Sequence, residues 1–89
     1  MFMDEEVIYL LSRFPKHKKL LLDLYTNDEE FRSMCQAYYN SAITLEKFER
    51  NIMKGFKSRK EYERVYSDLE SAIARSLNFF KETGTRNEK

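Results

Sequence analysis

Residues 28–54 read DEEFRSMCQAYYNSAITLEKFERNIMK, and this stretch decides the fold. Its apolar residues recur at steps of three and four, which places them along one side of an α-helix. They are Phe31, Met34, Cys35, Tyr38, Ala42, Leu45, Phe48 and Ile52, followed by Phe56. The pattern predicts a helix from Asp28 to Lys54, roughly 40 Å long at about 1.5 Å per residue. A helix with one apolar side must be covered, so we expect the rest of the chain to supply that cover.

A second apolar pattern of helical period follows, almost as long as the first. It consists of Tyr62, Val65, Tyr66, Leu69, Ala72, Ile73, Leu77 and Phe80. Gly55 is expected to end the first long helix in a left-handed conformation. Ser58 and Glu61 have the spacing of a capping box for the second helix. Because the connection through Gly55 is short, the two helices are predicted to form an antiparallel hairpin.

The segment before the hairpin predicts one or two short helices. Asp4 to Arg13 has an acidic first turn, and Pro15 ends that helix because proline lacks an amide proton. A second short helix is expected from Pro15 to about Tyr25. Its end is marked by two alternative capping boxes for the long helix, Thr26 with Glu29 or Asn27 with Glu30.

Composition supports a single all-α domain. Charged residues make up 35% of the 89-residue chain, which holds only two glycines and one proline. Such a composition favours helices over strands. We expect one domain over residues 1–84, with Gly84 ending the last helix and residues 85–89 forming a flexible tail.

The bulk charge and the single cysteine limit the classes of function. A formal net charge of +1 points to no nucleic acid, membrane or acidic partner. Cys35 alone can form no internal disulfide, which fits a reducing compartment. The first residues are acidic where a signal peptide would be basic, and no apolar run is long enough to span a bilayer. These features predict a cytoplasmic location.

Catalytic motifs are missing from the sequence. There is one histidine and one cysteine, and neither a glycine-rich phosphate loop nor paired histidines at metal-ligand spacing. Cys35 falls on the apolar stripe, where a free cysteine usually packs as a small hydrophobic residue. We therefore expect no enzyme activity, no cofactor and no metal.

Two basic clusters are candidate contacts for an anion or a partner. The first is Lys16, His17, Lys18 and Lys19, at the start of the second short helix, where cations oppose the helix dipole. Free amides and lysines there suit a phosphate or carboxylate, although a solvated face is the simpler interpretation. The second cluster, around the predicted hairpin turn, is Lys54, Lys57, Arg59, Lys60 and Arg64. Basic residues beside the aromatic Phe56 can bind a nucleic-acid backbone and stack a base.

The number of aromatic residues exceeds what the seam between two helices needs. A candidate apolar interface is formed by Tyr38, Tyr39, Tyr62, Tyr66, Phe79 and Phe80. One alternative is that the short N-terminal helices cover these rings. The other is that they bind a partner, either a second hairpin, giving a four-helix bundle with coiled-coil-like packing, or a helix of another protein.

One part of the chain resembles a known family. Residues 14–21 read FPKHKKLL, and Leu24, Asp28, Phe31, Met34, Tyr38, Leu45 and Glu49 follow at matching steps. Over about residues 14–49 the chain resembles the YdcH-like family of short bacterial helical proteins. The resemblance implies a helical hairpin, a bacterial origin and no established activity, with Phe14, Pro15 and His17 forming a structural corner.

The chain also departs from this family. It has an extra helix before Phe14, and Ser41 stands where the family prefers leucine. Glu70-Ser71-Ala72 replaces the Lys-Asp-Glu typical of the second helix, and the basic run before it is missing. The overall hypothesis is a dimeric, non-catalytic interaction or regulatory module that recognises protein through its aromatic stripe. The alternative is an anion or nucleic-acid binder that uses the two basic clusters.

Overall fold

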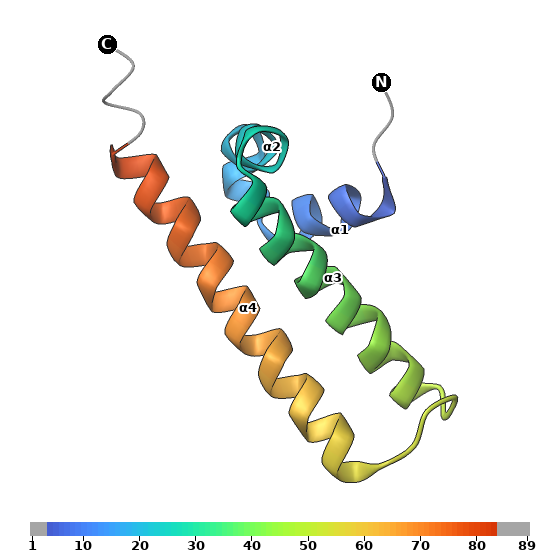
Figure 1. Cartoon of the computed structure of the whole chain (residues 1–89). Coiled ribbons are helices and arrows are strands. Elements are labelled where there is room, and N and C mark those ends of the chain that lie inside the picture. The colour runs from blue at the N-terminus through green and yellow to red at the C-terminus, as the bar shows by residue number, and fades with distance from the viewer. Residues whose placement is uncertain (1–3, 84–89) are drawn as a thin grey trace.

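The protein is an all-α molecule built around a long antiparallel hairpin, as predicted. The computed structural model describes residues 4–83 (Figure 1). The elements are α1 (Glu5–Arg13), a 3₁₀ turn (Pro15–His17), α2 (Lys18–Asn27), α3 (Glu29–Glu49) and α4 (Phe56–Thr83). The described part of the chain contains no strand. The predicted end of the last helix at Gly84 and the predicted tail lie outside the described residues.

The N-terminal segment forms two helices because Pro15 interrupts it. α1 ends at Arg13, and the chain makes one 3₁₀ turn before α2 begins at Lys18. The predicted capping boxes for α3 are wrong, because Thr26 and Asn27 both belong to α2. Asp28 caps α3 instead: its extended backbone starts the helix, and its Oδ1 accepts a hydrogen bond of 3.0 Å from the amide of Phe31.

The turn of the hairpin lies earlier than predicted. α3 ends at Glu49 rather than Lys54, because Asn51 takes the left-handed conformation at φ 61°. The amide of Asn51 donates to the carbonyl of Phe48, and that of Ile52 donates to the carbonyl of Lys47. This pair of bonds is a Schellman motif, and asparagine tolerates the left-handed position better than most residues.

Gly55 starts the second long helix and does not end the first. Its φ is 124°, a conformation that side chains rarely adopt, and its carbonyl accepts the amide of Arg59 at 3.0 Å. α4 therefore begins at Phe56. Ser58 lies inside the first turn, so the predicted capping box of Ser58 with Glu61 is wrong.

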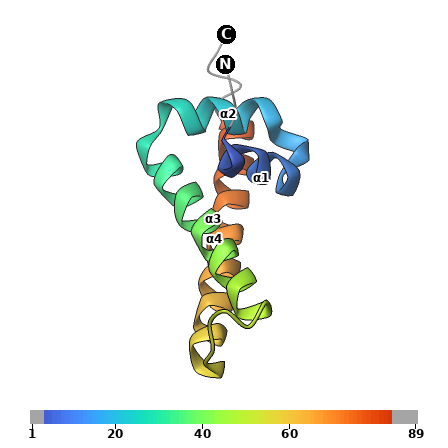
Figure 2. The ribbon, with the colours of Figure 1, turned by 90° about the vertical axis from the view of Figure 1, so that its right-hand side faces the viewer.

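The two short helices cover only one end of the hairpin. Figure 2 shows α2 crossing the end opposite the turn, with α1 beneath it. The main core lies there, between all four helices, and consists of Leu10, Leu21, Phe31, Cys35, Tyr38, Ile73 and Leu77. The molecule is 52 Å long, and its other end is a bare pair of helices closed by Phe48 against Tyr62. A bare helix pair has a single buried seam, so the outer faces of this end are open to solvent.

Candidate interaction surfaces

Two of the six residues of the predicted aromatic interface, Tyr38 and Tyr66, belong to the main core or pack against it. Tyr38 is fully buried, and its ring stacks on that of Tyr66 with centroids 4.6 Å apart. The hydroxyl of Tyr38 donates to that of Tyr66 at 3.0 Å, and the hydroxyls of Tyr66 and Tyr9 lie 2.5 Å apart. Arg13 donates from Nε to the hydroxyl of Tyr38 at 3.3 Å and binds Glu70 at 3.0 Å. In this fold α1 covers Tyr38 and Tyr66, which leaves neither ring open to a partner.

The other predicted aromatic residues are partly open. Tyr39 packs beside Tyr9 and points its hydroxyl at Glu5, 3.4 Å away. Tyr62 is exposed on the bare part of the hairpin. Phe79 is 59% exposed and contacts Phe80 edge to face.

Phe80 lines a hollow of about 610 Å³ between the start of α3 and the end of α4. The other lining residues are Asp28, Glu30, Phe31, Ser33, Met34 and Ser76. Asp28, one of the lining residues, caps α3 through its side chain and therefore already has a structural role.

The structure keeps the two predicted basic clusters apart. The first lies at the junction of α1 and α2, where Lys16 and His17 line a hollow of about 290 Å³ with Ala74 and Asn78 of α4. Lys18 and Lys19 are exposed in the first turn of α2. The second cluster begins at the hairpin turn. Fourteen residues of α4 separate Lys60 from Ala74, which is roughly 20 Å along the helix. The clusters therefore do not form one continuous basic surface.

The hairpin end carries a local excess of positive charge. Residues 47–64 hold seven Lys and Arg against three Asp and Glu, whereas residues 1–46 hold five against eight. The end is thus positive by four charges, and the part with the short helices is negative by three. This asymmetry is hidden in the overall net charge of +1.

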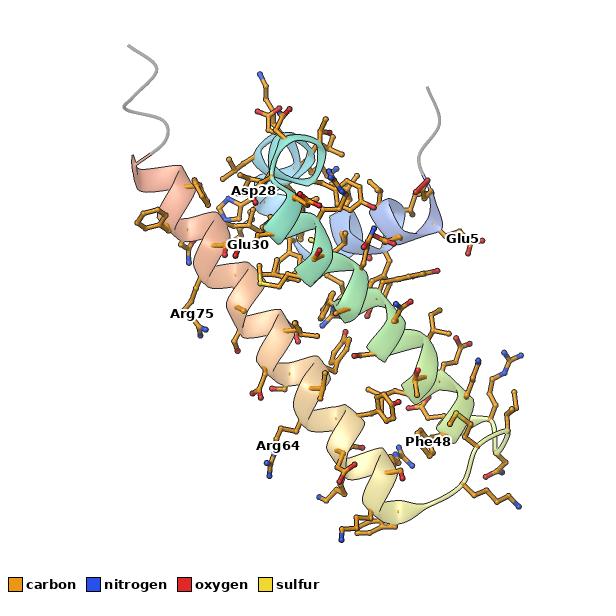
Figure 3. The ribbon with its side chains drawn as sticks, viewed as in Figure 1. Glu5, Asp28, Glu30, Phe48, Arg64 and Arg75 are labelled. Carbon is orange, nitrogen blue, oxygen red and sulfur yellow. The ribbon has the colours of Figure 1, made fainter. Side chains whose placement is uncertain are left out.

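One face of α4 near the turn combines free cations with an exposed aromatic ring, and we term it the α4 basic face. It comprises Phe56, Lys57, Lys60, Glu61, Arg64 and Val65. The last five residues line a shallow hollow of about 530 Å³, and Arg64 points away from α3 (Figure 3). Phe56 is 78% exposed, and the ammonium of Lys60 lies 5.7 Å from its ring centroid.

The cations of the α4 basic face have no carboxylate partner among the residues that the structure describes. Arg59, the remaining member of the cluster, is paired with Glu63 at 3.2 Å. No ion pair involves Lys57, Lys60 or Arg64 in the described part of the chain. Their charge is therefore available to an outside anion or carboxylate.

The loop after α3 exposes a second apolar and basic group, which we term the loop knob: Arg50, Ile52, Met53 and Lys54. Ile52 is 64% exposed although it continues the apolar stripe of α3. The reason is the left-handed turn at Asn51, which takes the following residues off the helix. Figure 1 shows this end of the loop on the side of α3 remote from α4, the side on which α1 also projects.

A groove of opposite charge lies where α1 meets α3, and we term it the α1–α3 corner. Its volume is about 460 Å³, and it is lined by Glu5, Ile8, Tyr9, Ser12, Tyr39, Ala42, Ile43 and Glu46. Ile8 is 55% exposed, whereas its neighbour Val7 is buried. The corner is thus apolar inside, with carboxylates at Glu5 and Glu46. Figure 3 shows Glu5 at the outer end of α1.

The sequence pattern did not single out the loop knob or the α1–α3 corner. The apolar period of α3 includes Ile52, which the structure leaves exposed. A charge count by segment was the available signal, since the acidic excess before residue 47 and the basic excess after it are visible in the sequence.

No group of three or more metal-ligating side chains occurs among residues 4–83. Cys35 is buried in the core, and this burial raises the pKa of its thiol to about 12, so it is a poor nucleophile at neutral pH. Within the described part, no helix has the length and apolar character to cross a membrane.

No protein-family model, curated protein or solved structure shows a significant match to this chain. The resemblance to the YdcH-like family therefore stays a prediction. Residues 14–49, which carry it, form the 3₁₀ turn, α2 and α3. Ser41, its main departure in α3, is buried, and its hydroxyl donates to the carbonyl of Ala37 at 3.0 Å.

Proposed function

We propose that the protein is a non-catalytic interaction module that binds another protein chain through the α4 basic face. The partner segment would carry carboxylates beside an apolar anchor. The observation that carries this proposal is the exposed ring of Phe56 among three cations without a carboxylate partner, on the bare end of a hairpin whose other end holds the main core.

The balance of energies favours a protein partner over a nucleic acid. Burying an exposed phenylalanine contributes about 2 kcal/mol. Each ion pair at an exposed site contributes only about 0.2–1 kcal/mol. The apolar share of binding is therefore comparable to the charge share. A nucleic-acid site of three cations is weak by comparison with the six to ten phosphate contacts of strong binders.

A site-specific crosslink tests the proposal. A photoreactive benzoyl group is placed on the ring at position 56, and the full-length protein is irradiated in cells. The control carries the same group at Ser71, an exposed position further along α4. We expect a protein adduct at position 56 that is absent at position 71.

Charge reversal then shows whether the adduct uses the cations. Lys57→Glu with Lys60→Glu should reduce the adduct about tenfold or more, since two ion pairs become repulsions. An adduct that is indifferent to this change, or equal labelling at position 71, would contradict the proposal. Adducts to nucleic acid, with a log–log salt slope of about −2 to −3 for three phosphate contacts, would support the alternative anion-binding function instead.

The cellular setting is part of the same proposal. A free buried thiol fits a reducing compartment. We therefore place this module in the cytoplasm, where its partner would be found.

A further inference from the structure

We infer that the α1–α3 corner binds a segment of another protein that carries an apolar side chain between two arginines. This contact lies outside the α4 basic face and does not rest on the function proposed for that face. The two surfaces would select segments of opposite charge, because the corner holds carboxylates and the α4 basic face holds mostly cations.

The corner is the space between two matched helix faces. Its α1 wall runs from Glu5 to Ser12 and its α3 wall from Tyr39 to Glu46, which is about 10 Å along each helix. The side chains of each wall recur at steps of three and four, so they share one side of their helix. α1 projects from the side of α3 that is remote from α4, and the two walls therefore diverge (Figure 1). A segment of about two helical turns fits along them.

The floor of the corner is apolar and partly open to solvent. Ile8 is 55% exposed, although its neighbour Val7 is buried on the core side of α1. Ile43 and Ala42 of α3 are only partly buried. Covering an exposed isoleucine in a concave site with another apolar side chain is favourable, because both leave water. The centre of the bound segment is therefore assigned an apolar side chain.

The two ends of the corner are acidic. At one end the hydroxyl of Tyr39 donates to the carboxylate of Glu5 at 3.4 Å, and Glu46 lies about 10 Å further along α3. None of the described residues that line the corner is basic. Desolvation, and then the negative charge of Glu5 above all, raise the pKa of the Tyr39 phenol. The corner therefore has a negative potential that favours a cation at each end.

Arginine matches this combination of an apolar floor and acidic ends. Its aliphatic stem lies along an apolar wall while its guanidinium reaches a carboxylate. The molecule already contains one such contact, because Arg50 binds Glu46 at 3.5 Å. That pair is exposed and therefore weak, so an incoming arginine can share or replace it. A metal ion does not fit, because carboxylates at opposite ends of the corner cannot coordinate one ion together.

Isoleucine methyl NMR spectra of the full-length protein test the inference. Ile8 and Ile43 line the corner. The other two isoleucines of the chain are internal controls, Ile52 in the exposed loop and Ile73 in the core. The probe is an alanine-based helical peptide with one leucine between two arginines, all on the same side. We expect the peptide to shift the signals of Ile8 and Ile43 and to leave the other two in place.

Two control peptides isolate the charge. In one, citrulline replaces both arginines, which keeps their shape and removes their charge; in the other, glutamate replaces them. The citrulline peptide should bind about tenfold more weakly or worse, and the glutamate peptide should not bind in the corner. Equal binding of the citrulline peptide, or preferential binding of the glutamate peptide, would overturn the inference.

Two further results would contradict it. One is an arginine peptide that leaves the signals of Ile8 and Ile43 unchanged at about 1 mM, which excludes even weak specific binding. The other is a shift of these two signals with protein concentration in the absence of peptide, because a second copy of the chain would then occupy the corner.

A matched pair of variants places the binding site. Glu5→Gln/Glu46→Gln removes both carboxylates from the corner, and we expect an affinity for the arginine peptide that is about tenfold lower or worse. Glu29→Gln/Glu30→Gln removes two carboxylates at the start of α3, outside the corner, and should change the affinity less than about twofold because salt screens distant charges. All four side chains are exposed, so circular dichroism should show an unchanged helix content. An equal loss in both variants would show only a general attraction to acidic residues and would overturn the assignment.

These outcomes are independent of the proposed function. Both variants retain Phe56, Lys57 and Lys60, so they should still give the partner adduct at position 56. Loss of peptide binding with retention of that adduct would separate the two contacts.

Discussion

The phenol ring of Tyr38 on α3 lies parallel to that of Tyr66 on α4, with the ring planes 17° apart and the centroids 4.6 Å apart. The hydroxyls of both residues are joined to Tyr9 and Arg13 of α1 through hydrogen bonds. This contact ties three helices together and fixes how far α1 reaches along the hairpin. Beyond the α1–α3 corner, toward the turn, the hairpin consists of α3 and α4 alone.

Removing the central hydroxyl of this cluster should destabilise the fold. Tyr66→Phe keeps the stacked ring but takes away the partner of both Tyr9 and Tyr38. We expect the free energy of unfolding to fall by about 1–2 kcal/mol, since a partly buried hydroxyl then loses its hydrogen bond. Urea denaturation followed by circular dichroism measures this. Tyr39→Phe is the control, because its hydroxyl is exposed and 3.4 Å from Glu5, and its cost should be below about 0.5 kcal/mol.

Stability should decline in alkaline solution. Burial, first of all, raises the pKa of Tyr9 and of Tyr25 from 10 to about 12, and that of Cys35 from 9 to about 12. The hydrogen bonds to Tyr66 and Glu6 add to the shifts of the two tyrosines. Between about pH 9 and 12 the unfolded chain therefore holds fewer protons on these groups than the folded chain does.

The contribution of these groups is thus fully present below about pH 9 and is lost as the pH rises toward 12. Denaturant unfolding at a series of pH values measures the slope. Tyr25→Phe removes one of the three groups and should make the slope shallower. A slope that Tyr25→Phe leaves unchanged would show that this hydroxyl is not held protonated by the fold.

The cap of α3 should be a single-residue determinant of stability. Asp28→Ala removes the acceptor for the amide of Phe31, and we expect a loss of about 1 kcal/mol, within the range of 0.5–2 kcal/mol for such caps. Asp28→Asn should retain most of the stability because asparagine caps equally well. Thermal unfolding measures both. Asp23→Ala, at an exposed position within α2, is the matched control; a loss as large as that of Asp28→Ala would mean that charge rather than capping is at work.

The turn after α3 should depend on the left-handed residue. Asn51→Gly is expected to be neutral or slightly stabilising, whereas Asn51→Val should cost about 1–2 kcal/mol, because a branched side chain clashes at positive φ. Chemical denaturation of the two variants gives the difference. Equal stability would indicate that the Schellman turn is not formed in solution.

The same turn shows why the sequence predicts the helices better than the surfaces. The apolar period of three and four runs on through Ile52 and Phe56, so periodicity alone extends α3 to Lys54. The helix ends at Glu49 because the backbone hydrogen bonds around Asn51 form a Schellman turn there. Asparagine is a weaker helix-stop signal than glycine, so the sequence pattern favours Gly55 as the end of the helix.

The aromatic residues illustrate a second limit. Tyr38 and Tyr62 look alike in the heptad-like pattern, but one is fully buried and the other exposed. The difference depends on how far α1 reaches over the hairpin. This is a property of tertiary packing and cannot be read from the residues around either tyrosine. The basic cluster at the turn was recognisable from its composition. Its division into an α4 face and a loop knob required the position of the turn.

The central claim is that the end of the hairpin near the turn makes the functional contact, and lysine reactivity in cells tests it most directly. Amine labelling of Lys57 and Lys60 is compared with that of Lys18 and Lys19, which are exposed at the other end of the molecule. The account predicts that Lys57 and Lys60 are labelled less in cells than in the purified protein, relative to Lys18 and Lys19, and that nuclease treatment leaves this protection in place. An unchanged ratio between the two lysine pairs, or protection confined to Lys18 and Lys19, would contradict the account.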